Sequence, residues 1–423
     1  MKEYKLSQLL EIKNGKDHKE LPNGDYPVFG SGGVMRYVNE YLYDKASILL
    51  PRKGSLNNIQ YCDVPFWTVD TLYYTEVNEK IACPYYLYNY LCLLDLSGLD
   101  TGTGVPSMTF DSYYNIKVLL PEIEEQKRVA SVLQNLDHKI ALNRQINDNL
   151  EAMAKQLYDY WFVQFDFPNE EDKPYKSSGG AMVWNEKLKR KIPQGWSDCI
   201  LGDYIGRITN GLNPRKNFVL GSGNNYYVTI RSLVGTTIDW NNCDRCDDEA
   251  LSKINSRSQL QIGDIIFSAI GTIGRTYYIL EEPTNWNISE TSLTLRAKEN
   301  VPNDFFYGML RSNEIQIKAD KAAMGSTLRC LVMNSLCSLQ YIKIPNYMMK
   351  SFAAKVSTLY RQIHRNNKEI AELTKQRDEL LPLLMNGQAT VNYHLSARTD
   401  IPTLNLQNLH YTANTIKISI TFS

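Results

Sequence analysis

The chain lacks an excess of charge of either sign. Lys+Arg and Asp+Glu number 46 each among its 423 residues. A strongly basic balance is the usual electrostatic footprint of a protein that binds nucleic acid on its own, so a nucleic-acid partner has to be argued from local features. The hydrophobic fraction of 43% and the charged fraction of 22% exclude a disordered or fibrous chain and indicate a globular one.

Long apolar runs and dense cysteines are also missing. No run approaches the roughly 20 apolar residues of a membrane helix, and the N-terminal MKEYKLSQLLEIKNG has no apolar signal-peptide core. The 8 cysteines are scattered, which indicates a reducing compartment. We therefore expect a cytoplasmic protein that does not contact a membrane.

Catalytic motifs are missing as well. No GxxxxGK[ST], no GxGxxG between a strand and a helix and no HExxH occurs. No Asn-Pro-Pro or Asp-Pro-Pro precedes an aromatic residue, as the base pocket of an amino-methyltransferase would require. Cys243 and Cys246 form a single CxxC without the second pair that a structural zinc site needs. We expect no catalytic residue, no metal site and no cofactor in this chain.

One glycine-rich stretch invites a catalytic interpretation. YPVFGSGGVMRY (26–37) resembles the turns that hold phosphates or S-adenosylmethionine, but an alternating, strand-like pattern follows it where a phosphate loop would open into a helix. Its counterpart in the second half of the chain, NYYVTIRSLVG (225–235), has no glycine cluster. The glycines therefore predict a tight turn between strands that lets the backbone approach a partner closely.

The chain contains an internal repeat. Five pairs of segments recur in the same order in the two halves, which is difficult to attribute to chance. The pairs are KLSQLLEIKNG and ILGDYIGRITNG, SILLPRKGS and DIIFSAIGT, DTLYY and ETSLTL, PYYLYNYL and DFFYGML, and GTGVPSMTFDSYYNIKVLLP and GSTLRCLVMNSLCSLQYIKIP.

A long helical pattern follows each copy. Apolar residues alternate by three and four, and the two series superpose at a shift of 223 residues with Asn143 and Asn366 at equivalent places. This spacing predicts a seam that needs a partner helix, on helices of roughly 50 Å. Either each helix packs on its own domain or, more economically, the two helices pair antiparallel. The matched asparagines would then meet near the middle of the crossing, where a buried polar pair can fix the register. The predicted seam comprises Leu133, Leu136, Ile140, Asn143, Leu150, Leu157, Val356, Leu359, Ile363, Asn366, Ile370, Leu373 and Leu380.

Several motifs together resemble one family. LLPEIEEQKRVASVLQNLDHKI (119–140), KIPQGW (191–196), YPVFGSGG and LLPLLMNGQATV, in this order and with this repeat, resemble the specificity (S) subunits of type I restriction–modification systems, which defend a host against foreign DNA. The resemblance covers about residues 1–391. It departs from the family pattern at the start of the second helix, which lacks the acidic EEQ of 124–126, and in the added tail.

The resemblance implies an α+β fold with two tandem mixed α/β target-recognition domains separated by two long helices forming an antiparallel coiled coil. Each domain would read one half of a bipartite, asymmetric site in double-stranded DNA. The helices would set the spacer and dock two methyltransferase subunits. The corresponding segments are 1–121 (first recognition domain), 122–164 (central helix), 165–196 (linker), 197–345 (second recognition domain), 346–388 (C-terminal helix) and 389–423 (a tail of unassigned role, with one possible strand, TIKISITF).

The same resemblance assigns the chemistry to other chains. Adenine methylation and ATP-driven cleavage would belong to methyltransferase and restriction subunits, and so would S-adenosylmethionine, ATP and magnesium. On the central helix, the first contacts with a methyltransferase are expected at Glu124, Glu125, Gln126 and Arg128.

Base reading requires donors and acceptors on turns that can enter a groove. The candidates in the first half are Lys16, His18, Ser31, Arg36, Arg52, Lys53, Ser55, Asn57 and Asn58. The candidates in the second half are Asn210, Asn213, Arg215, Lys216, Arg231, Ser268, Thr272 and Arg275. Three alternatives stay open: a silent or recombining specificity cassette, a coiled-coil adaptor that recognises protein, and, against the missing motifs, a free-standing methyltransferase or nuclease.

Overall fold

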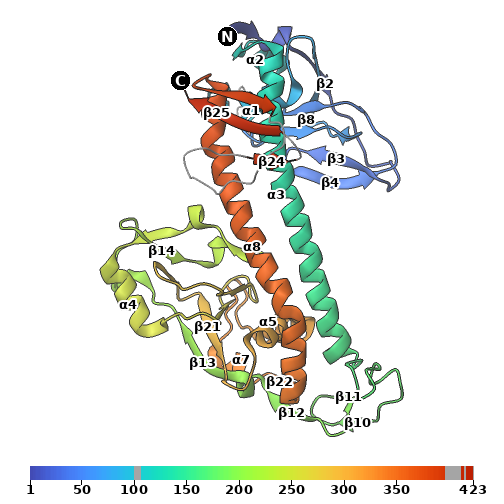
Figure 1. The fold of residues 1–423 in the computed structure, drawn as a ribbon, viewed down its shortest axis with the longest axis vertical. Helices are drawn as coiled ribbons and strands as arrows, with labels where there is room; N and C mark the ends of the chain where they lie inside the picture. The colour runs from blue at the N-terminus through green and yellow to red at the C-terminus, as the bar shows by residue number, and fades with distance from the viewer. Residues whose placement is uncertain (100–105, 396–410, 414–415, 423) are drawn as a thin grey trace. The chain divides into compact units, whose positions relative to one another are not determined.

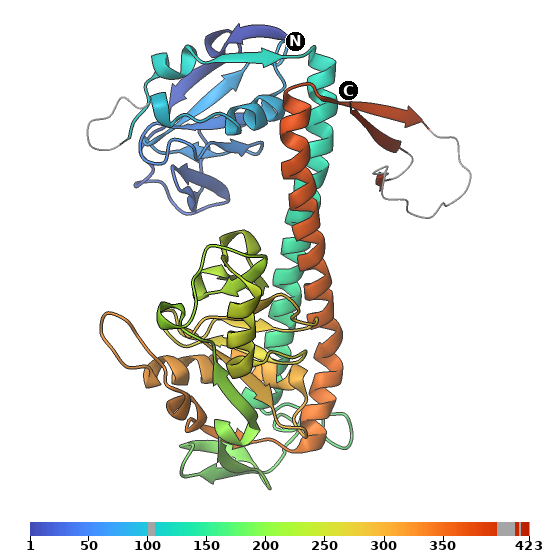
Figure 2. The same cartoon turned by 90° about the vertical axis from the view of Figure 1, so that its left-hand side faces the viewer.

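The computed structural model describes residues 1–99, 106–395, 411–413 and 416–422. They form two compact units, one of Met1–Ala141 with Ala371–Ser423 and one of Leu142–Ile370. The strands of each unit lie beside the stretch of long helix that belongs to that unit (Figures 1 and 2). The unit boundary cuts both long helices, so it does not follow the duplicated segments, and the domain limits expected from the sequence stay predictions.

The first unit contains a four-stranded and a three-stranded sheet. The larger has the order β2-β8-β5-β6 (Leu10–Asn14, Leu72–Val77, Ser47–Pro51, Gln60–Cys62). The smaller has the order β4-β3-β7 (Gly33–Val38, Tyr26–Gly30, Trp67–Thr68). Strand β1 (Lys2–Lys5) pairs antiparallel with β9 (Lys117–Leu120), so the start and end of this copy lie together. Helices α1 (Pro84–Cys92) and α2 (Phe110–Tyr114) complete it.

The second unit repeats this strand order. Its four-stranded sheet is β13-β21-β18-β19 (Ile205–Asn210, Ser292–Ala297, Ile265–Ser268, Thr276–Tyr278). Its three-stranded sheet is β17-β14-β20 (Asp244–Cys246, Asn225–Val228, Trp286–Ile288). Strand β12 (Ser197–Ile200) pairs with β22 (Gln340–Lys343) as β1 does with β9.

One pairing confirms the predicted repeat in detail. Each smaller sheet contains one parallel pair, in which Val28 lies opposite Trp67 in the first copy and Tyr226 opposite Trp286 in the second. Parallel neighbours require a crossover connection, so a shared parallel pair at the same place indicates shared topology. The matched segments PYYLYNYL and DFFYGML are likewise both helical, in α1 and in α5 (Asn303–Arg311).

The second copy carries additional elements. Among them are the short hairpin β15–β16 (Leu233–Val234, Thr237–Ile238) and the helices α4 (Asp248–Ser258) and α6 (Asn313–Ala322). Helix α7 (Met333–Cys337) is not additional, because it precedes β22 as α2 precedes β9. Asp247 is the N-cap of helix α4: its side chain accepts a hydrogen bond from the backbone N–H of Ala250.

The long helices are α3 (Ile123–Tyr158), which continues into a π-helical turn at Asp159–Val163, and α8 (Asn346–Met385). Glu124 and Glu125 lie in the first turn of α3, where negative charge favours a helix start. Most predicted seam residues are buried, whereas Leu150, Leu157, Leu359 and Ile370 are half-buried.

Contacts in the second unit show that the two helices run antiparallel there. In the second unit Asn366 donates to Asn147 at 2.8 Å and Asn143 donates to Glu369 at 2.9 Å. In the first unit Arg377 donates to Asp137 at 2.8 Å. In the second unit, residue numbers therefore increase along α3 in the direction in which they decrease along α8.

The expected pairing of Asn143 with Asn366 is wrong. The two asparagines are equivalent in the repeat, but equivalence along the chain does not make two positions opposite each other in an antiparallel pair. The register brings Asn366 to Asn147, one turn further along α3, and Asn147 also donates to Asn367 at 2.8 Å. A buried amide pair still lies in the seam, one turn away from the predicted position.

The aromatic core of the second unit joins its strands to the helices. Phe352 of α8 packs edge-on against Phe162, with ring centroids 5.2 Å apart, and against Tyr158 at 5.6 Å. Phe305 of α5 meets Phe162 at 5.4 Å. All four rings are buried, so this part of the helix pair forms one core with the strands and helices of the second unit.

The segment 165–196, expected to be a linker, is folded. It contains the hairpin β10–β11 (Met182–Asn185, Arg190–Pro193). Phe167 stacks on Trp196 with ring centroids 5.1 Å apart and belongs to the buried core of the second unit. Its composition indicated a linker because most of its Pro, Gly and Ser residues form turns before the hairpin and most of its charged residues are exposed.

The tail contains the strand that TIKISITF suggested. Strand β25 (Ile416–Phe422) pairs antiparallel with β23 (Ala389–Leu395) and with β24 (Tyr411–Ala413). The rest of 389–423 lies outside the described residues. None of the described helices combines the length and apolar character needed to span a membrane.

Candidate nucleic-acid interface

The glycine-rich stretch forms a turn between strands, as predicted. Strands β3 and β4 are joined across Gly30 and Gly33, and Gly33 has a φ of +117°, a conformation that favours glycine. A bulge between Val28 and Phe29 shifts the register just before the turn. Bulges and glycine turns re-aim the chain at a sheet edge, which suits a recognition loop better than a cofactor loop.

A second loop of the first unit lies against this turn. The 52–58 loop follows β5, and its Asn58 side chain donates to the backbone carbonyl of Ser31. Next to it, Gln60 donates to the carbonyl of Gly30 at 2.9 Å. The structure thus brings Ser31 together with the loop that carries Arg52, Lys53, Ser55, Asn57 and Asn58.

These residues differ in how available their polar groups are. Lys16, Lys53, Ser55, Asn57 and Asn58 are exposed, although the Asn57 oxygen accepts the backbone N–H of Leu96 at 3.1 Å. Arg52 is half-buried and donates to the carbonyl of Asp70 at 3.3 Å.

Two candidates of the first unit have structural contacts or an acidic neighbour. Arg36 donates to the carbonyl of Leu21 at 2.7 Å and to Asn23 at 3.0 Å, so its guanidinium holds the preceding loop. His18 is half-buried beside Asp17. The backbone N–H groups of Lys19 and His18 lower the pKa of the Asp17 carboxyl, which keeps a negative charge between Lys16 and His18. These positions are weaker candidates for contact with DNA than the 52–58 loop.

In the second unit, Asn210 and Asn213 have structural roles. Asn210 accepts from the Arg257 guanidinium at 2.7 Å. Asn213 accepts the backbone N–H of Arg215 at 2.9 Å and donates to Glu290 at 2.8 Å. The neighbouring Arg215 is exposed, and Lys216 lies in the same short 3-10 turn, Pro214–Lys216.

The turn after β18 is stabilised by hydrogen bonds within itself and by hydrogen bonds to the neighbouring loop at 230–233. Ser268 is buried, with its hydroxyl donating to the carbonyl of Thr272 at 2.6 Å and accepting the N–H of Arg275 at 2.7 Å. Arg275 donates to the carbonyls of Ile230 and Leu233, at 3.0 and 2.9 Å. Because Ser268 is buried and its hydroxyl proton is already donated within the turn, we remove it from the candidates. Thr272 and Arg231 stay exposed, in two loops that Arg275 joins.

The sequence analysis missed Glu290. Its carboxylate accepts from Asn213 and, at 2.9 Å, from the hydroxyl of Tyr227. Burial and the negative charge of Glu290 raise the pKa of Tyr227, which therefore stays a hydrogen-bond donor. The signal was present, because ETSLTL matches DTLYY and places Glu290 at the position of Asp70, beside Arg52.

The four helix residues expected to contact a methyltransferase differ from one another in burial and in their hydrogen-bond and ion-pair partners. Gln126 is buried, accepting the N–H of Cys83 at 2.9 Å and donating to the carbonyls of Ile81 and Pro121. Its expected role in docking is wrong, because it ties α3 to the first recognition domain. Glu125 and Arg128 form an ion pair on the helix surface, and Glu124 pairs with Lys127 at 3.0 Å.

The described residues bring together no group of three or more His, Cys, Asp or Glu side chains able to hold a metal ion. At the CxxC motif, Cys243 donates to the carbonyl of Asp239 at 3.3 Å and Cys246 is buried in β17. Burial raises the pKa of both thiols, whereas a metal ligand or a nucleophile needs a thiolate. The motif therefore behaves as part of the core.

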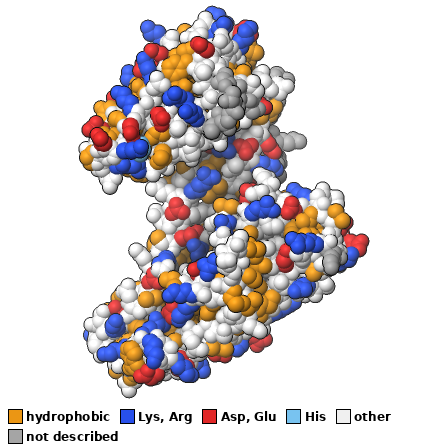
Figure 3. Space-filling model, turned by 180° about the vertical axis from the view of Figure 1, so that it is seen from behind, with side chains coloured by type: hydrophobic (Ala, Val, Ile, Leu, Met, Phe, Trp, Pro, Cys, Tyr) orange, Lys and Arg blue, Asp and Glu red, His pale blue; other side chains and the backbone are white. Residues whose placement is uncertain are grey.

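Charge of both signs is mixed on the face of the molecule that Figure 3 shows. On the face seen in Figure 3, Lys and Arg side chains alternate with Asp and Glu, and no broad single-sign field appears on either unit. Phosphate contacts supply most of the salt-dependent affinity for DNA, while base contacts supply specificity. A mixed surface with reading loops fits a protein whose partners share the phosphate contacts.

Comparison with known proteins agrees with this geometry. Residues 1–152 match the family model described as "Type I restriction modification DNA specificity domain". The chain is 25% identical to the type I restriction enzyme MjaIX specificity subunit of Methanocaldococcus jannaschii, over 88% of this chain and 86% of the relative. It is 22% identical to the HindI specificity subunit of Haemophilus influenzae, over 74% of this chain and 79% of the relative.

A solved structure shares the fold. The crystal structure of a type I restriction–modification S subunit from M. genitalium superposes with a TM-score of 0.55 at 17% identity, covering 91% of this chain and 96% of that one. The match extends beyond one recognition domain, so the similarity applies to the whole duplicated architecture.

Proposed function

We propose that the chain is a specificity subunit of a type I restriction–modification system, as its similarity to that domain model and to such subunits supports. Its two recognition domains would read the two halves of one bipartite, asymmetric DNA site. The observation that carries this proposal is a duplicated strand order with unlike loops. A shared framework that presents two different sets of polar loop residues suits the reading of two different short sequences.

The long helices would act as the spacer and the docking platform in this proposal. An antiparallel coiled coil with a buried amide pair favours one register, and a fixed register is what a ruler between two half-sites requires. Two methyltransferase subunits would bind to the helices, and restriction subunits would join through the complex. S-adenosylmethionine would be bound by the methyltransferase subunits, and ATP with magnesium by the restriction subunits.

The test is co-expression of the chain with the methyltransferase subunit of the same system, followed by modified-base sequencing of the host DNA. We expect a bipartite motif with methylated adenine in each half. The motif should be absent when either chain is omitted, and the purified chain alone should methylate nothing.

The other outcomes identify the alternatives. A stable complex that methylates no motif would indicate a silent cassette. Failure to form any complex with the methyltransferase would support an adaptor that recognises other proteins. Methylation by the isolated chain would restore the enzyme interpretation that the missing motifs argue against.

A further inference from the structure

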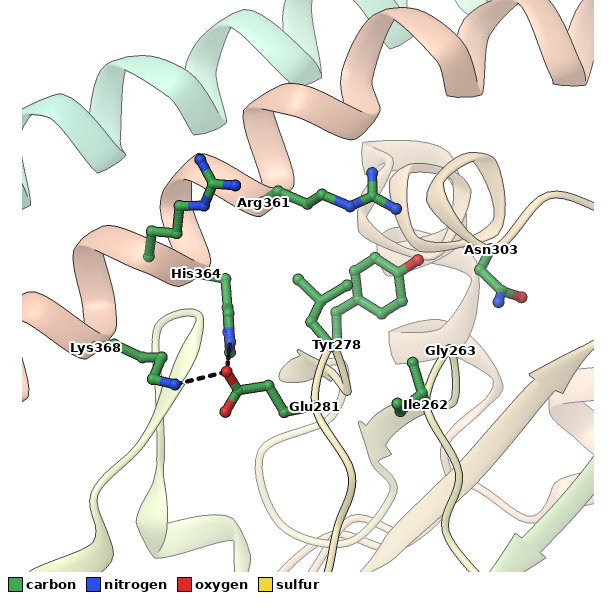
Figure 4. A pocket seen from close by; sticks show the side chains of 10 residues that line it. Ile262, Gly263, Tyr278, Glu281, Asn303, Arg361, His364 and Lys368 are labelled. Carbon is green, nitrogen blue, oxygen red and sulfur yellow. Dashed lines mark hydrogen bonds and ion pairs between the residues drawn. The ribbon is translucent and has the colours of Figure 1, made fainter.

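A cleft in the second unit combines several basic side chains. Its volume is about 560 Å³, and it lies between α8 and the loops around β18 and β19. Figure 4 shows Arg361, His364 and Lys368 on the helix facing Tyr278, Glu281 and Asn303. Arg365, Ile262, Gly263 and Leu280 complete the lining.

The basic residues share one face of α8. They occupy positions 361, 364, 365 and 368, a spacing of three and four that stacks side chains on one side of a helix. The seam uses the opposite face, through Ile363, Asn366 and Ile370. The basic face is therefore separate from the packing that holds the helices together.

The cleft keeps an excess of positive charge. Glu281 carries the only carboxylate among the lining residues. It forms an ion pair with Lys368 at 2.6 Å, and its carboxylate lies 3.2 Å from Nε2 of His364. These contacts lower the pKa of the Glu281 carboxyl, so one negative charge offsets Lys368. Asp304 lies beside the lining residue Asn303 and accepts from the Tyr278 hydroxyl at 3.1 Å. Within the part of the chain that the structure describes, no ion pair involves Arg361 or Arg365, and both are exposed.

The repeat shows that this charge is not a requirement of the helix. In the repeat, a shift of 223 residues makes His138, Ala141, Leu142 and Gln145 of α3 the equivalents of Arg361, His364, Arg365 and Lys368. The seam pattern is retained at this shift, but the positive charge is not. The basic face is therefore specific to the second copy and needs an explanation of its own.

The cleft is lined by the same stretch of α8 that contacts a candidate reading loop. Asn367 donates to the hydroxyl of Thr236 at 3.3 Å, in the turn of the β15–β16 hairpin. The base of that hairpin is fixed by Arg275 through the carbonyl of Leu233. A duplex read by the exposed Arg231 of this loop would thus come close to the basic face of α8.

We propose that this cleft, through Arg361 and Arg365, binds a phosphate of the DNA backbone beside the half-site read by the second recognition domain; the inference rests on the proposed function. A guanidinium matches a phosphate with two parallel N–H···O bonds. Small-molecule pockets are mostly apolar, whereas this cleft is lined mainly by polar and charged groups. The contact adds affinity without reading a base.

The test uses the complete complex with its methyltransferase subunits and the double variant Arg361→Gln with Arg365→Gln. Loss of two exposed phosphate contacts should weaken binding by roughly 2- to 30-fold. The loss should be equal for duplexes with and without the target motif. The slope of log affinity against log salt should fall by about 0.9, the change expected for one phosphate. The methylated motif should stay unchanged.

The matched control is Arg144→Gln with Lys350→Gln, which removes the same charge from exposed positions on α3 and α8 outside the cleft. An equal loss in the control would mean that only net charge matters, which overturns the proposal. An unchanged affinity and salt slope in the Arg361/Arg365 variant would also overturn it.

A third arm separates the sources of phosphate. ATP and inorganic phosphate are titrated into the complex in the absence of DNA. Binding of either that the double variant abolishes, while DNA affinity stays unchanged, would assign the cleft to a free nucleotide or anion and overturn the assignment to DNA. If the unaltered complex neither binds nor methylates a motif, the proposed function fails first.

Discussion

The two copies of the duplicated fold share their strand order and differ in the loops between matched strands. In the first, β3 turns directly into β4 through the glycine turn at 30–33. In the second, the hairpin β15–β16 and two 3-10 turns separate β14 from its partner β17. The strands are determined by cross-strand packing, which both copies retain, while loops on the surface can change length at little cost. The comparison indicates that the framework was duplicated and the recognition loops diverged.

The copies also differ in the side chains that pack against the long helices. Replacing such a side chain in the second copy is expected to give the largest loss of unfolding free energy. Phe352 is fully buried and touches Trp161, Phe162 and Phe305, with ring centroids 5.8, 5.2 and 6.2 Å away. Replacing it with Ala should cost about 3–5 kcal/mol of unfolding free energy.

The equivalent residue of the first copy is Val129, also buried. Val129→Ala removes less volume and should cost about 2 kcal/mol. Urea unfolding of both variants, followed by circular dichroism, measures the difference. Equal losses would show that the aromatic cluster adds nothing to the attachment of the second copy.

A smaller effect is expected at the amide pair of the seam. Asn366→Leu removes the donor to Asn147 and leaves a buried oxygen unpaired, which should cost about 1–3 kcal/mol. The double variant Asn147→Leu with Asn366→Leu should recover part of that loss, because an apolar pair replaces a polar one while Asn367 loses its donor.

The double variant should also loosen the helix register. Cysteines placed across the seam would detect this as cross-links at more than one register. A double variant that keeps a single register would show that the amides do not specify it.

The smallest effect is expected at the ion pair of the first unit. Asp137 accepts from Arg377 at 2.8 Å and from the hydroxyl of Tyr85, and both charged side chains are about one-third exposed. Asp137→Asn should cost less than about 1 kcal/mol, and less still at high salt. Thermal unfolding at two salt concentrations measures it. A loss as large as that of Asn366→Leu, independent of salt, would contradict this ranking.

The sequence predicted the repeat and the seam because both leave periodic apolar patterns. Strand segments such as SILLP and DIIFS are buried along their length, and the seam residues recur at helical spacing. The partner of Asn366 could not be predicted in this way, because antiparallel register depends on where each helix starts and on the packing around it.

Loop residues were less predictable for a related reason. Ser268, Arg36 and Asn210 have the residue types that read bases, but their partners lie in other loops and come from the tertiary fold. The 165–196 hairpin was missed because composition outweighed the aromatic signal of Phe167 and Trp196. Polar residue type alone does not separate a binding group from one that holds its own loop.

The most direct test of the account compares equivalent changes in the two copies. Arg52→Gln with Lys53→Gln alters the first copy, and Arg215→Gln with Arg231→Gln alters the second. Each variant is co-expressed with the methyltransferase subunit, and the methylated motif is sequenced. Each lost base contact is worth about 1–3 kcal/mol of discrimination. The account predicts that each variant relaxes only one half of the motif and keeps the other half and the spacer. Relaxation of both halves by one variant would contradict it.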